Sequence, residues 1–367
     1  MDGLLVIDKP PGPTSHDVVA RLRRVLGERR IGHTGTLDPA ASGVLPLVLG
    51  RATRLARFLS AGDKGYDAVI RFGIATDTYD AEGAPLASPY RGPMPSRDAI
   101  DRALDAFRGT YLQQPPAFSA KKIEGTRSHR LARARARDSA DQHSFTGAGA
   151  PRRHPNAAAA LGTPPPARTD ADASPQTARH ATPARLPRWG PRHGRGRSLP
   201  APVRVTAYAV EIVGVDGDTV TLHVDCSAGF YVRALAHDLG ERLGTGAHLA
   251  RLRRTSSGDF TLADALSFES AERNSDEARR AVVPLAHMLP RWSSVVLTDE
   301  GARRVAHGRD VRPDDITASV PPGRQPVRFP PGTHRAAVRL LDPRGDLIGI
   351  AEAAQSPGLL HPSVVLV

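Results

Sequence analysis

Two short apolar runs near the N-terminus flank an amphipathic segment. Residues 4–10 (LLVIDKP) have the length and composition of a buried strand that stops at proline, and residues 44–50 (VLPLVLG) read as a second strand. Between them, the apolar spacing in residues 14–27 predicts a helix, which Thr14 or Ser15 would cap and a glycine would close. The apolar face of that helix consists of Val18, Val19, Leu22, Val25 and Leu26.

Further along the chain, the pattern of apolar and polar residues has the period of a strand in some segments and the period of a helix in others. Alternation predicts a strand in residues 66–72 and two strands around an Asp-Gly turn in residues 203–227. Helical spacing is present in residues 51–62, 98–107 and 230–244. The inward positions of the predicted strands are Tyr66, Ala68, Ile70, Phe72, Val220, Leu222, Val224 and Cys226. No repeat with a period of about 20 to 50 residues occurs, which excludes a solenoid.

The pattern breaks down in the middle of the chain and changes again near its C-terminus. Residues 111–138 read as a proline-broken loop that leads into a very basic helix. From about 139 to 199 the chain is mainly Pro, Ala, Arg, Gly and Thr, so we expect a disordered basic insertion. Residues 293–367 predict a small all-β module of short strands separated by Pro and Gly turns. We therefore expect two domains, 1–292, interrupted by the insertion, and 293–367.

Length and charge narrow the class of protein. The chain has 367 residues, long enough for about two domains, and a formal net charge of +12, which favours a polyanionic partner such as nucleic acid. Cys226 is the only cysteine, which excludes an internal disulfide framework and a cysteine-cluster zinc site. No apolar run approaches the roughly 20 residues that span a bilayer, and the N-terminus does not resemble a signal peptide. We expect a cytoplasmic protein that is not attached to a membrane.

One loop, residues 32–43 (GHTGTLDPAASG), concentrates residues that can carry chemistry. Its glycines allow close approach of the backbone to a ligand, and Asp38 is either the start of an ordinary Asp-Pro turn or a carboxylate nucleophile or base. The chain has no GxxxxGK[ST] loop for a nucleoside triphosphate. Taken singly, His33, Tyr66 and Arg233 have structural explanations as well, as a loop histidine, a core tyrosine and a surface arginine.

The motifs taken together resemble one family, the bacterial tRNA pseudouridine-55 synthases of the TruB family. The resemblance covers nearly all of the chain before about residue 260, apart from the insertion, and its blocks occur in the family's order. They are LLVIDKPPGPTSHDVV, RRIGHTGTLDPAASGVLPLVLGRATRLARFL, DKGYDAVIRFGIATDTYDAEG, QQPPAFSAKKIEGTR and CSAGFYVRALAHDLGERLGTGAHLARLRRTSSGDF.

The resemblance implies roles for three candidate catalytic residues. Asp38, in GTLDP, matches the family's catalytic aspartate. Tyr66, in KGYDA, matches the tyrosine that stacks on the target base and is implicated in proton removal. Arg233, in FYVRAL, matches the arginine that pairs with the catalytic carboxylate. Because an aspartate is already ionised at neutral pH, the arginine is expected to hold the carboxylate in place.

The resemblance also implies how RNA is held. His33 matches the histidine that fills the gap left by the flipped nucleotide, and Tyr231 and Leu252 match further substrate contacts. Arginines of the first helix, of the basic stretch after residue 118 and of RLRR at 251–254 are expected to contact phosphates. The C-terminal module resembles a PUA-like domain, which in the family helps to grip tRNA. Two departures are His129, where the family usually has a tyrosine, and the length of the insertion.

These observations lead to one hypothesis and two alternatives. We expect an α+β pseudouridine synthase with a mixed, mainly antiparallel sheet, which isomerises uridine 55 in the T-arm of tRNA. It would need no metal or cofactor, would have no obligatory protein partner and would act as a monomer. The alternatives are a tRNA-binding chaperone without catalytic activity and a pseudouridine synthase that acts on another RNA, such as ribosomal RNA.

Overall fold

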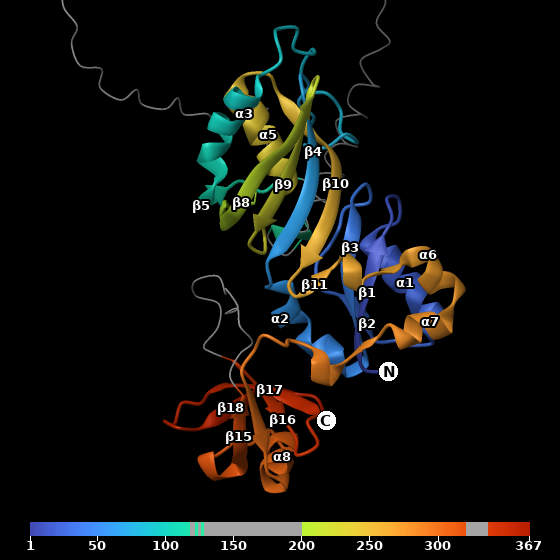
Figure 1. Ribbon diagram of the computed structural model, residues 1–367, viewed down its shortest axis with the longest axis vertical. Coiled ribbons are helices and arrows are strands. Elements are labelled where there is room, and N and C mark those ends of the chain that lie inside the picture. Colours follow the sequence, from blue (N-terminus) through green and yellow to red (C-terminus); the bar gives the residue numbers. More distant parts are fainter. Residues whose placement is uncertain (118–121, 124–125, 128–199, 321–336) are drawn as a thin grey trace, which may run out of the picture.

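The structure is a computed structural model (Figure 1), and it describes residues 1–117, 122–123, 126–127, 200–320 and 337–367. Its strands form an 11-stranded sheet, a 5-stranded sheet and a 2-stranded ladder of β6 (Lys122–Ile123) and β7 (Thr126–Arg127). The insertion expected at 139–199, most of the basic helix expected before it, and His129 lie outside the described residues.

The larger sheet is mixed and mainly antiparallel, as expected. Its main path runs β12-β1-β3-β10-β4-β9-β8-β5, with β2 paired to β3, β11 to β10 and β13 to β1. Among the described strands of this sheet, only the pairs β1–β12 and β3–β10 are parallel. The strands are β1 (Gly3–Lys9), β2 (Ile31–His33), β3 (Ser42–Leu49), β4 (Lys64–Phe72), β5 (Gly109–Gln113), β8 (Val203–Asp216), β9 (Thr219–Cys226), β10 (Ala247–Ser257), β11 (Phe260–Thr261), β12 (Leu266–Ser267) and β13 (Val283–Pro284).

Strand β10 joins the N-terminal part of the sheet to the rest. It pairs antiparallel with β4 along its length and parallel with β3 at Arg253 and Arg254. The register with β4 shifts after Leu249 and again after Arg254. The sequence pattern did not predict this strand, because these shifts and its arginines interrupt the alternation of polar and apolar residues.

Two helical layers cover separate parts of the sheet. Helices α3 (Arg97–Leu104) and α5 (Val232–Leu243) pack on β4, β9 and β8, whereas α1 (Ser15–Leu26), α6 (Phe268–Arg273) and α7 (Ser275–Arg280) pack on β1 and β3 (Figure 1). The inward positions predicted for β4 and β9 are confirmed. All eight lie in the hydrophobic cluster beneath α3 and α5: Tyr66, Ala68, Ile70, Phe72, Val220, Leu222, Val224 and Cys226.

Local sequence signals account for α1. The Thr14 hydroxyl accepts a hydrogen bond from Asp17 N at 3.0 Å, and the Asp17 carboxylate accepts one from Thr14 N at 2.9 Å, which forms a capping box. At the other end, Gly27 adopts φ 65° and closes the helix. Of the predicted apolar face only Val25 is half-buried, and the others are buried.

Other helical predictions needed adjustment. Residues 51–62 form a 3₁₀ turn (Gly50–Leu55) followed by α2 (Ala56–Ser60). Residues 98–107 hold most of α3 and a 3₁₀ turn (Asp105–Phe107). The start of the predicted loop at 111–138 is the end of β5, because its backbone pairs with β8. None of the described helices is both long enough and apolar enough to span a membrane.

The C-terminal module is not all-β, so that prediction is wrong. Its sheet runs in the order β15-β14-β16-β17-β18, and one helix, α8 (Asp299–Ala306), packs on it. Thr298 caps this short helix by accepting from Gly301 N at 3.0 Å, and Val305 is its buried apolar contact. A helix of two turns has too few apolar positions to reveal its period. The strands are β14 (Ser294–Leu297), β15 (Ile316–Val320), β16 (Val338–Leu341), β17 (Leu347–Ala353) and β18 (Leu360–Val365).

The C-terminal module and the rest of the chain share a hydrophobic core. Leu347 and Leu366 of the module lie in one cluster with Leu4 and Phe58 from the first part of the chain. Arg51 adds a polar contact, because its Nη1 donates to Leu366 O at 2.7 Å. Figure 1 shows the module against α2, at the end of the larger sheet. Burial of apolar surface between the two parts couples their stabilities.

Candidate active site

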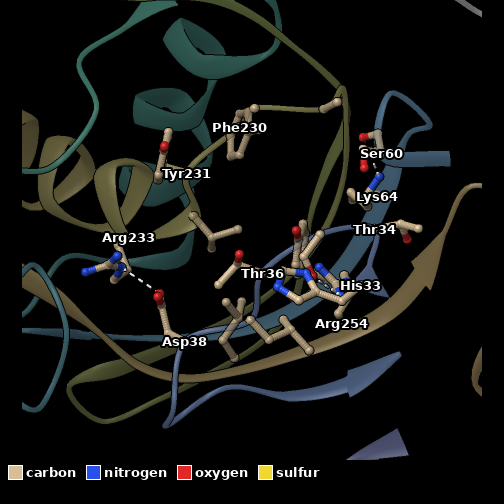
Figure 2. Close-up of a pocket in the computed structure, with 17 residues that line it drawn as sticks. His33, Thr34, Thr36, Asp38, Ser60, Lys64, Phe230, Tyr231, Arg233 and Arg254 are labelled. Atoms are coloured by element: carbon tan, nitrogen blue, oxygen red, sulfur yellow. Dashed lines mark hydrogen bonds and ion pairs between the residues drawn. The ribbon is translucent and has the colours of Figure 1, made fainter. Parts of the chain in front are cut away.

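The residues that the sequence singled out meet in one cavity of about 430 Å³ (Figure 2). All six predicted site residues line it: His33, Asp38, Tyr66, Tyr231, Arg233 and Leu252. They come from the end of β2 and the loop after it, from β4, from the start of α5 and from β10. The other lining residues are Thr34, Gly35, Thr36, Leu37, Ser60, Lys64, Ala228, Gly229, Phe230, Val232 and Arg254.

The loop that carries Asp38 is held by residues from β1 and α1. The Ser15 hydroxyl donates to Leu37 O at 3.0 Å and accepts from Leu37 N at 2.9 Å, so it fixes the residue before Asp38. On the other side, Lys9 Nζ donates to Pro39 O at 3.2 Å. Burial lowers the pKa of Lys9 to about 8, and the nearby Asp38 carboxylate opposes this shift. The backbone on both sides of Asp38 is therefore fixed.

The side chain of Arg254 also supports the loop that carries Asp38. The residue is 1% exposed, and its side chain donates from Nε to Val44 O at 2.6 Å and from Nη2 to Gly35 O at 3.1 Å. Gly43 allows the close approach, because a Cβ there would lie 2.1 Å from Arg254 O and its φ is 104°. Of the RLRR arginines expected to contact phosphates, Arg254 is thus excluded by burial, and Arg253 pairs with Asp8 at 2.7 Å.

Arg233 links Asp38 to a second carboxylate. Its Nε lies 3.0 Å from Asp38 Oδ2 (Figure 2), and its Nη1 lies 3.3 Å from Asp80 Oδ2. The Arg233 side chain is 9% exposed, whereas that of Asp38 is 44% exposed and faces the cavity. Nη1 also donates to Thr78 O at 3.1 Å. This arrangement orients the Asp38 carboxylate while it leaves that group accessible to a ligand.

Asp80 belongs to an acidic turn, TDTYDAEG, in which the sequence analysis singled out no site residue. Its carboxylate also accepts from Thr78 Oγ1 at 2.6 Å and from Glu82 N at 3.1 Å. Gly83 is required in the turn, because a Cβ there would lie 2.3 Å from Thr78 Oγ1. The segment TDTYDAEG combines carboxylates, threonines and glycine much as the Asp38 loop does, and this is the signal that could have revealed Asp80.

Tyr66 and Lys64 lie on the same face of β4 at the floor of the cavity. Burial raises the pKa of Tyr66, and the neighbouring Arg254 opposes this shift only in part, so the phenol is neutral at pH 7. Lys64 Nζ donates to Ser60 O at 3.3 Å and to Gly62 O. Burial and, to a smaller extent, the Arg254 charge lower the pKa of Lys64 to about 8. Apolar ring surface and hydrogen-bond donors therefore lie side by side.

Tyr231 and His33, two ring-bearing residues that line the cavity, are each held by a contact with a neighbouring residue. Gln113, which is fully buried, donates to Tyr231 O at 3.0 Å and accepts from Tyr231 N at 2.8 Å. The ring of His33 meets that of His16 edge-to-face, with centroids 5.3 Å apart. The sequence pattern missed Gln113, because only its distant pairing with Tyr231 distinguishes it from any other polar residue.

Within the described residues, some of the arginines expected to contact phosphates already contact other groups of the protein, and most of the basic stretch after residue 118 lies outside those residues. In α1, Arg21 lies 3.5 Å from Glu272, and Arg23 donates to Ile31 O at 2.6 Å. Arg21, Arg23 and Arg24 are nevertheless exposed on that helix, and Arg251 is exposed on β10. No group of three or more His, Cys, Asp or Glu side chains in the described ranges is arranged to hold a metal ion.

Known proteins are similar to this chain in sequence and in fold. Residues 23–144 match the TruB family pseudouridylate synthase (N terminal domain), and residues 233–290 match the tRNA pseudouridylate synthase B C-terminal domain. The tRNA pseudouridine synthase B of Solibacter usitatus is 36% identical over 100% of both chains. That of Gloeobacter violaceus is 42% identical over 74% of this chain and 73% of the relative.

A solved structure, that of a Cbf5-Nop10-Gar1 complex, has a similar fold. It superposes with a TM-score of 0.62 at 23% identity, covering 100% of this chain and 85% of the other. The archaeal box H/ACA sRNP Nop10-Cbf5 complex gives a TM-score of 0.60 at 22% identity. At this identity the likeness concerns the fold, which is the expected α+β architecture.

Proposed function

Because the chain belongs to the TruB family of pseudouridylate synthases, we propose that it converts uridine 55 in the T-arm of tRNA to pseudouridine. The observation that carries the proposal is the pairing of Asp38 with Arg233 at 3.0 Å in a cavity that Tyr66 also lines. A protein that only binds RNA has no need for a half-exposed carboxylate held in this way.

The target base must first leave the folded RNA arm. Extruding it costs a few kcal/mol, which contacts in the cavity and in the vacated stack would offset. Tyr66 offers an aromatic wall for stacking on the base, and Tyr231 and Leu252 would complete the walls. His33, at the rim beside His16, would occupy the gap left in the RNA.

The reaction breaks the bond between C1′ of the ribose and N1 of uracil and forms a bond between C1′ and C5. It involves no net oxidation: the hydrogen on C5 leaves as a proton, and N1, released from the ribose, gains a proton. Asp38 would start the reaction by adding to the base or the sugar, or by removing a ribose proton. In each route Arg233 keeps the carboxylate in reach of the flipped nucleotide, which supplies the positional part of catalysis.

Tyr66 contributes mainly by stacking. Burial raises the pKa of its phenol, so the hydroxyl is a weak base at neutral pH. It could accept the C5 proton only after the new carbon–carbon bond has made that proton acidic. We therefore propose that Tyr66 acts mainly as the wall of the cavity on which the base stacks, and only secondarily in proton transfer.

The remaining contacts with RNA would come from the exposed cations and the C-terminal module. Arg24 and Arg251 are exposed and available for phosphate contacts. We propose that the PUA-like module at 293–367 adds to the grip on tRNA, and that the protein acts in the cytoplasm as a monomer without an obligatory protein partner, metal or cofactor.

The test is to incubate the purified protein with an unmodified tRNA transcript and to map pseudouridine along it. The same transcript with cytidine in place of uridine 55, and a ribosomal RNA fragment, serve as controls. We expect pseudouridine at position 55 only, and none in either control. Tight tRNA binding without product would support the chaperone alternative, and product in the ribosomal fragment alone would support the other RNA substrate.

A further inference from the structure

Tyr79 has a backbone conformation that side chains rarely adopt. Its φ is 66°, and among the described non-glycine residues only Leu289 shares a positive value. A bulky residue in the left-handed region costs free energy, and such a residue persists only where its surroundings require it. Tyr79 lies between Thr78 and Asp80, the two residues that contact Arg233 Nη1.

Backbone hydrogen bonds and a ring contact hold Tyr79 in place. Its backbone N donates to Thr76 O at 3.2 Å, and its carbonyl accepts from Leu249 N of β10 at 2.9 Å. The residue is 8% exposed, and its ring stacks on the ring of His237 with centroids 3.9 Å apart and an angle of 9° between the planes. The turn is thus attached to β10 by its backbone and to α5 by its side chain.

The two residues of α5 that contact this turn, Arg233 and His237, lie one helical turn apart. His237 follows Arg233 by four residues, so both side chains lie on one face of the helix, one turn apart. Arg233 contacts the Thr78 carbonyl and the Asp80 carboxylate, while His237 stacks on the ring of Tyr79, the residue between them. Neither Tyr79 nor His237 lines the cavity.

We propose that Tyr79 and His237 are positioning residues for catalysis: their stack fixes the turn against α5, so that Arg233 is held toward Asp38 in one orientation. The left-handed conformation of Tyr79 directs its carbonyl to β10 and leaves the Thr78 carbonyl and the Asp80 carboxylate facing one guanidinium nitrogen. The inference about rate rests on the proposed function, whereas the inference about Arg233 geometry does not.

Four variants test the proposal. Tyr79→Gly accepts the same φ but removes the ring, His237→Ala removes the other half of the stack, and Tyr79→Phe keeps both the ring and the backbone. Ile100→Val is the control for a small loss of core packing, since Ile100 is fully buried in the hydrophobic cluster beneath α3 and α5, does not line the cavity and takes no part in the stack. Thermal unfolding of all four establishes that each is folded at the assay temperature.

The first readout is the single-turnover rate of pseudouridine formation at saturating tRNA, with the Kd for tRNA measured separately. We expect Tyr79→Gly and His237→Ala to be slower by at least about tenfold with Kd unchanged, because misplacing Asp38 affects the chemical step. Tyr79→Phe and Ile100→Val should react at the wild-type rate. On an Arg233→Lys background, Tyr79→Gly should cause no further loss, because its effect acts through Arg233.

The second readout needs no activity. The Arg233 Nε–H resonance, identified as the signal that Arg233→Lys lacks, should shift and exchange faster with solvent in Tyr79→Gly and His237→Ala, but not in Tyr79→Phe. If wild type makes no pseudouridine and these changes still occur, the proposed function fails and the positioning role stands. An unchanged resonance, a rate loss explained by Kd, or additive losses with Arg233→Lys would each overturn the positioning role.

Discussion

The ion pair between Arg233 and Asp80 allows the role of the buried network to be tested without altering any residue that lines the cavity. We consider Asp80→Asn, which keeps the shape of the side chain and one oxygen acceptor but removes the charge. At 3.3 Å, Coulomb's law with an effective dielectric of about 20 gives about 5 kcal/mol before desolvation. The net effect is smaller, because Arg233 keeps its pairing with Asp38, 3.0 Å away.

A hydrogen bond between charged groups contributes about 1.5–3 kcal/mol net, and asparagine recovers part of it. If the remainder serves to orient Asp38, the single-turnover rate should fall by about 10- to 100-fold, at 1.36 kcal/mol per factor of ten. The Kd for tRNA should not change, since Asp80 does not line the cavity. The assay is release of tritium from tRNA labelled at uridine carbon 5, with tRNA in saturating amounts.

Asp77→Asn is the control from the same turn. The Asp77 carboxylate accepts from Ala84 N at 2.9 Å, so the change perturbs the turn without removing a charge from Arg233. We expect a rate close to that of wild type. A wild-type rate in Asp80→Asn, or equal losses in the two variants, would refute the claim that Asp80 acts through Arg233.

Three further predictions concern stability and RNA binding. The hydrogen bond to Asp67 raises the pKa of His223 above 6.5 in the folded protein. Protonated His223 therefore stabilises the fold below pH 6.5, and this stabilisation is lost as the pH rises through the folded-state pKa. The decrease in Tm caused by His223→Gln should accordingly be larger at pH 5 than at pH 8.5. Leu366→Ala should cost about 2–5 kcal/mol within a single calorimetric transition, because Leu366 is fully buried in the shared core; a separate early transition would contradict this. Replacing residues 139–199 by a short linker should leave product formation intact and reduce the salt dependence of tRNA binding, and a complete loss of activity in folded protein would show that this expectation is wrong.

Local patterns in the sequence were sufficient to predict most of the helices and strands of the fold. The alternation in 66–72 and the capped amphipathic helix in 14–27 each depend on neighbouring residues, and both are confirmed. Strand β10 was missed, because two register shifts and its buried Arg254 hide the alternation. Helix α8 was missed because it is short.

The residues of the site likewise divide into those that a local pattern in the sequence reveals and those that only the folded chain reveals. Asp38 and its loop could be singled out because special residues lie close together in the sequence. Gln113 could not, because its partner, Tyr231, is 118 positions away. The role of Asp80 likewise depends on Arg233, 153 positions away, so that only the folded chain shows the two carboxylates on one guanidinium. Pairings of this kind follow from the sheet topology and leave no local signal.

Asp38→Asn tests the central claim most directly, because the change removes the proposed reacting group and leaves the shape of the side chain. Wild type and variant are incubated side by side with an unmodified tRNA transcript, and both tRNA binding and pseudouridine at position 55 are measured. We expect wild type to complete the conversion, and the variant to bind the transcript equally well and form no product. Full activity in the variant, or wild-type protein that binds the transcript without modifying it, would contradict the account.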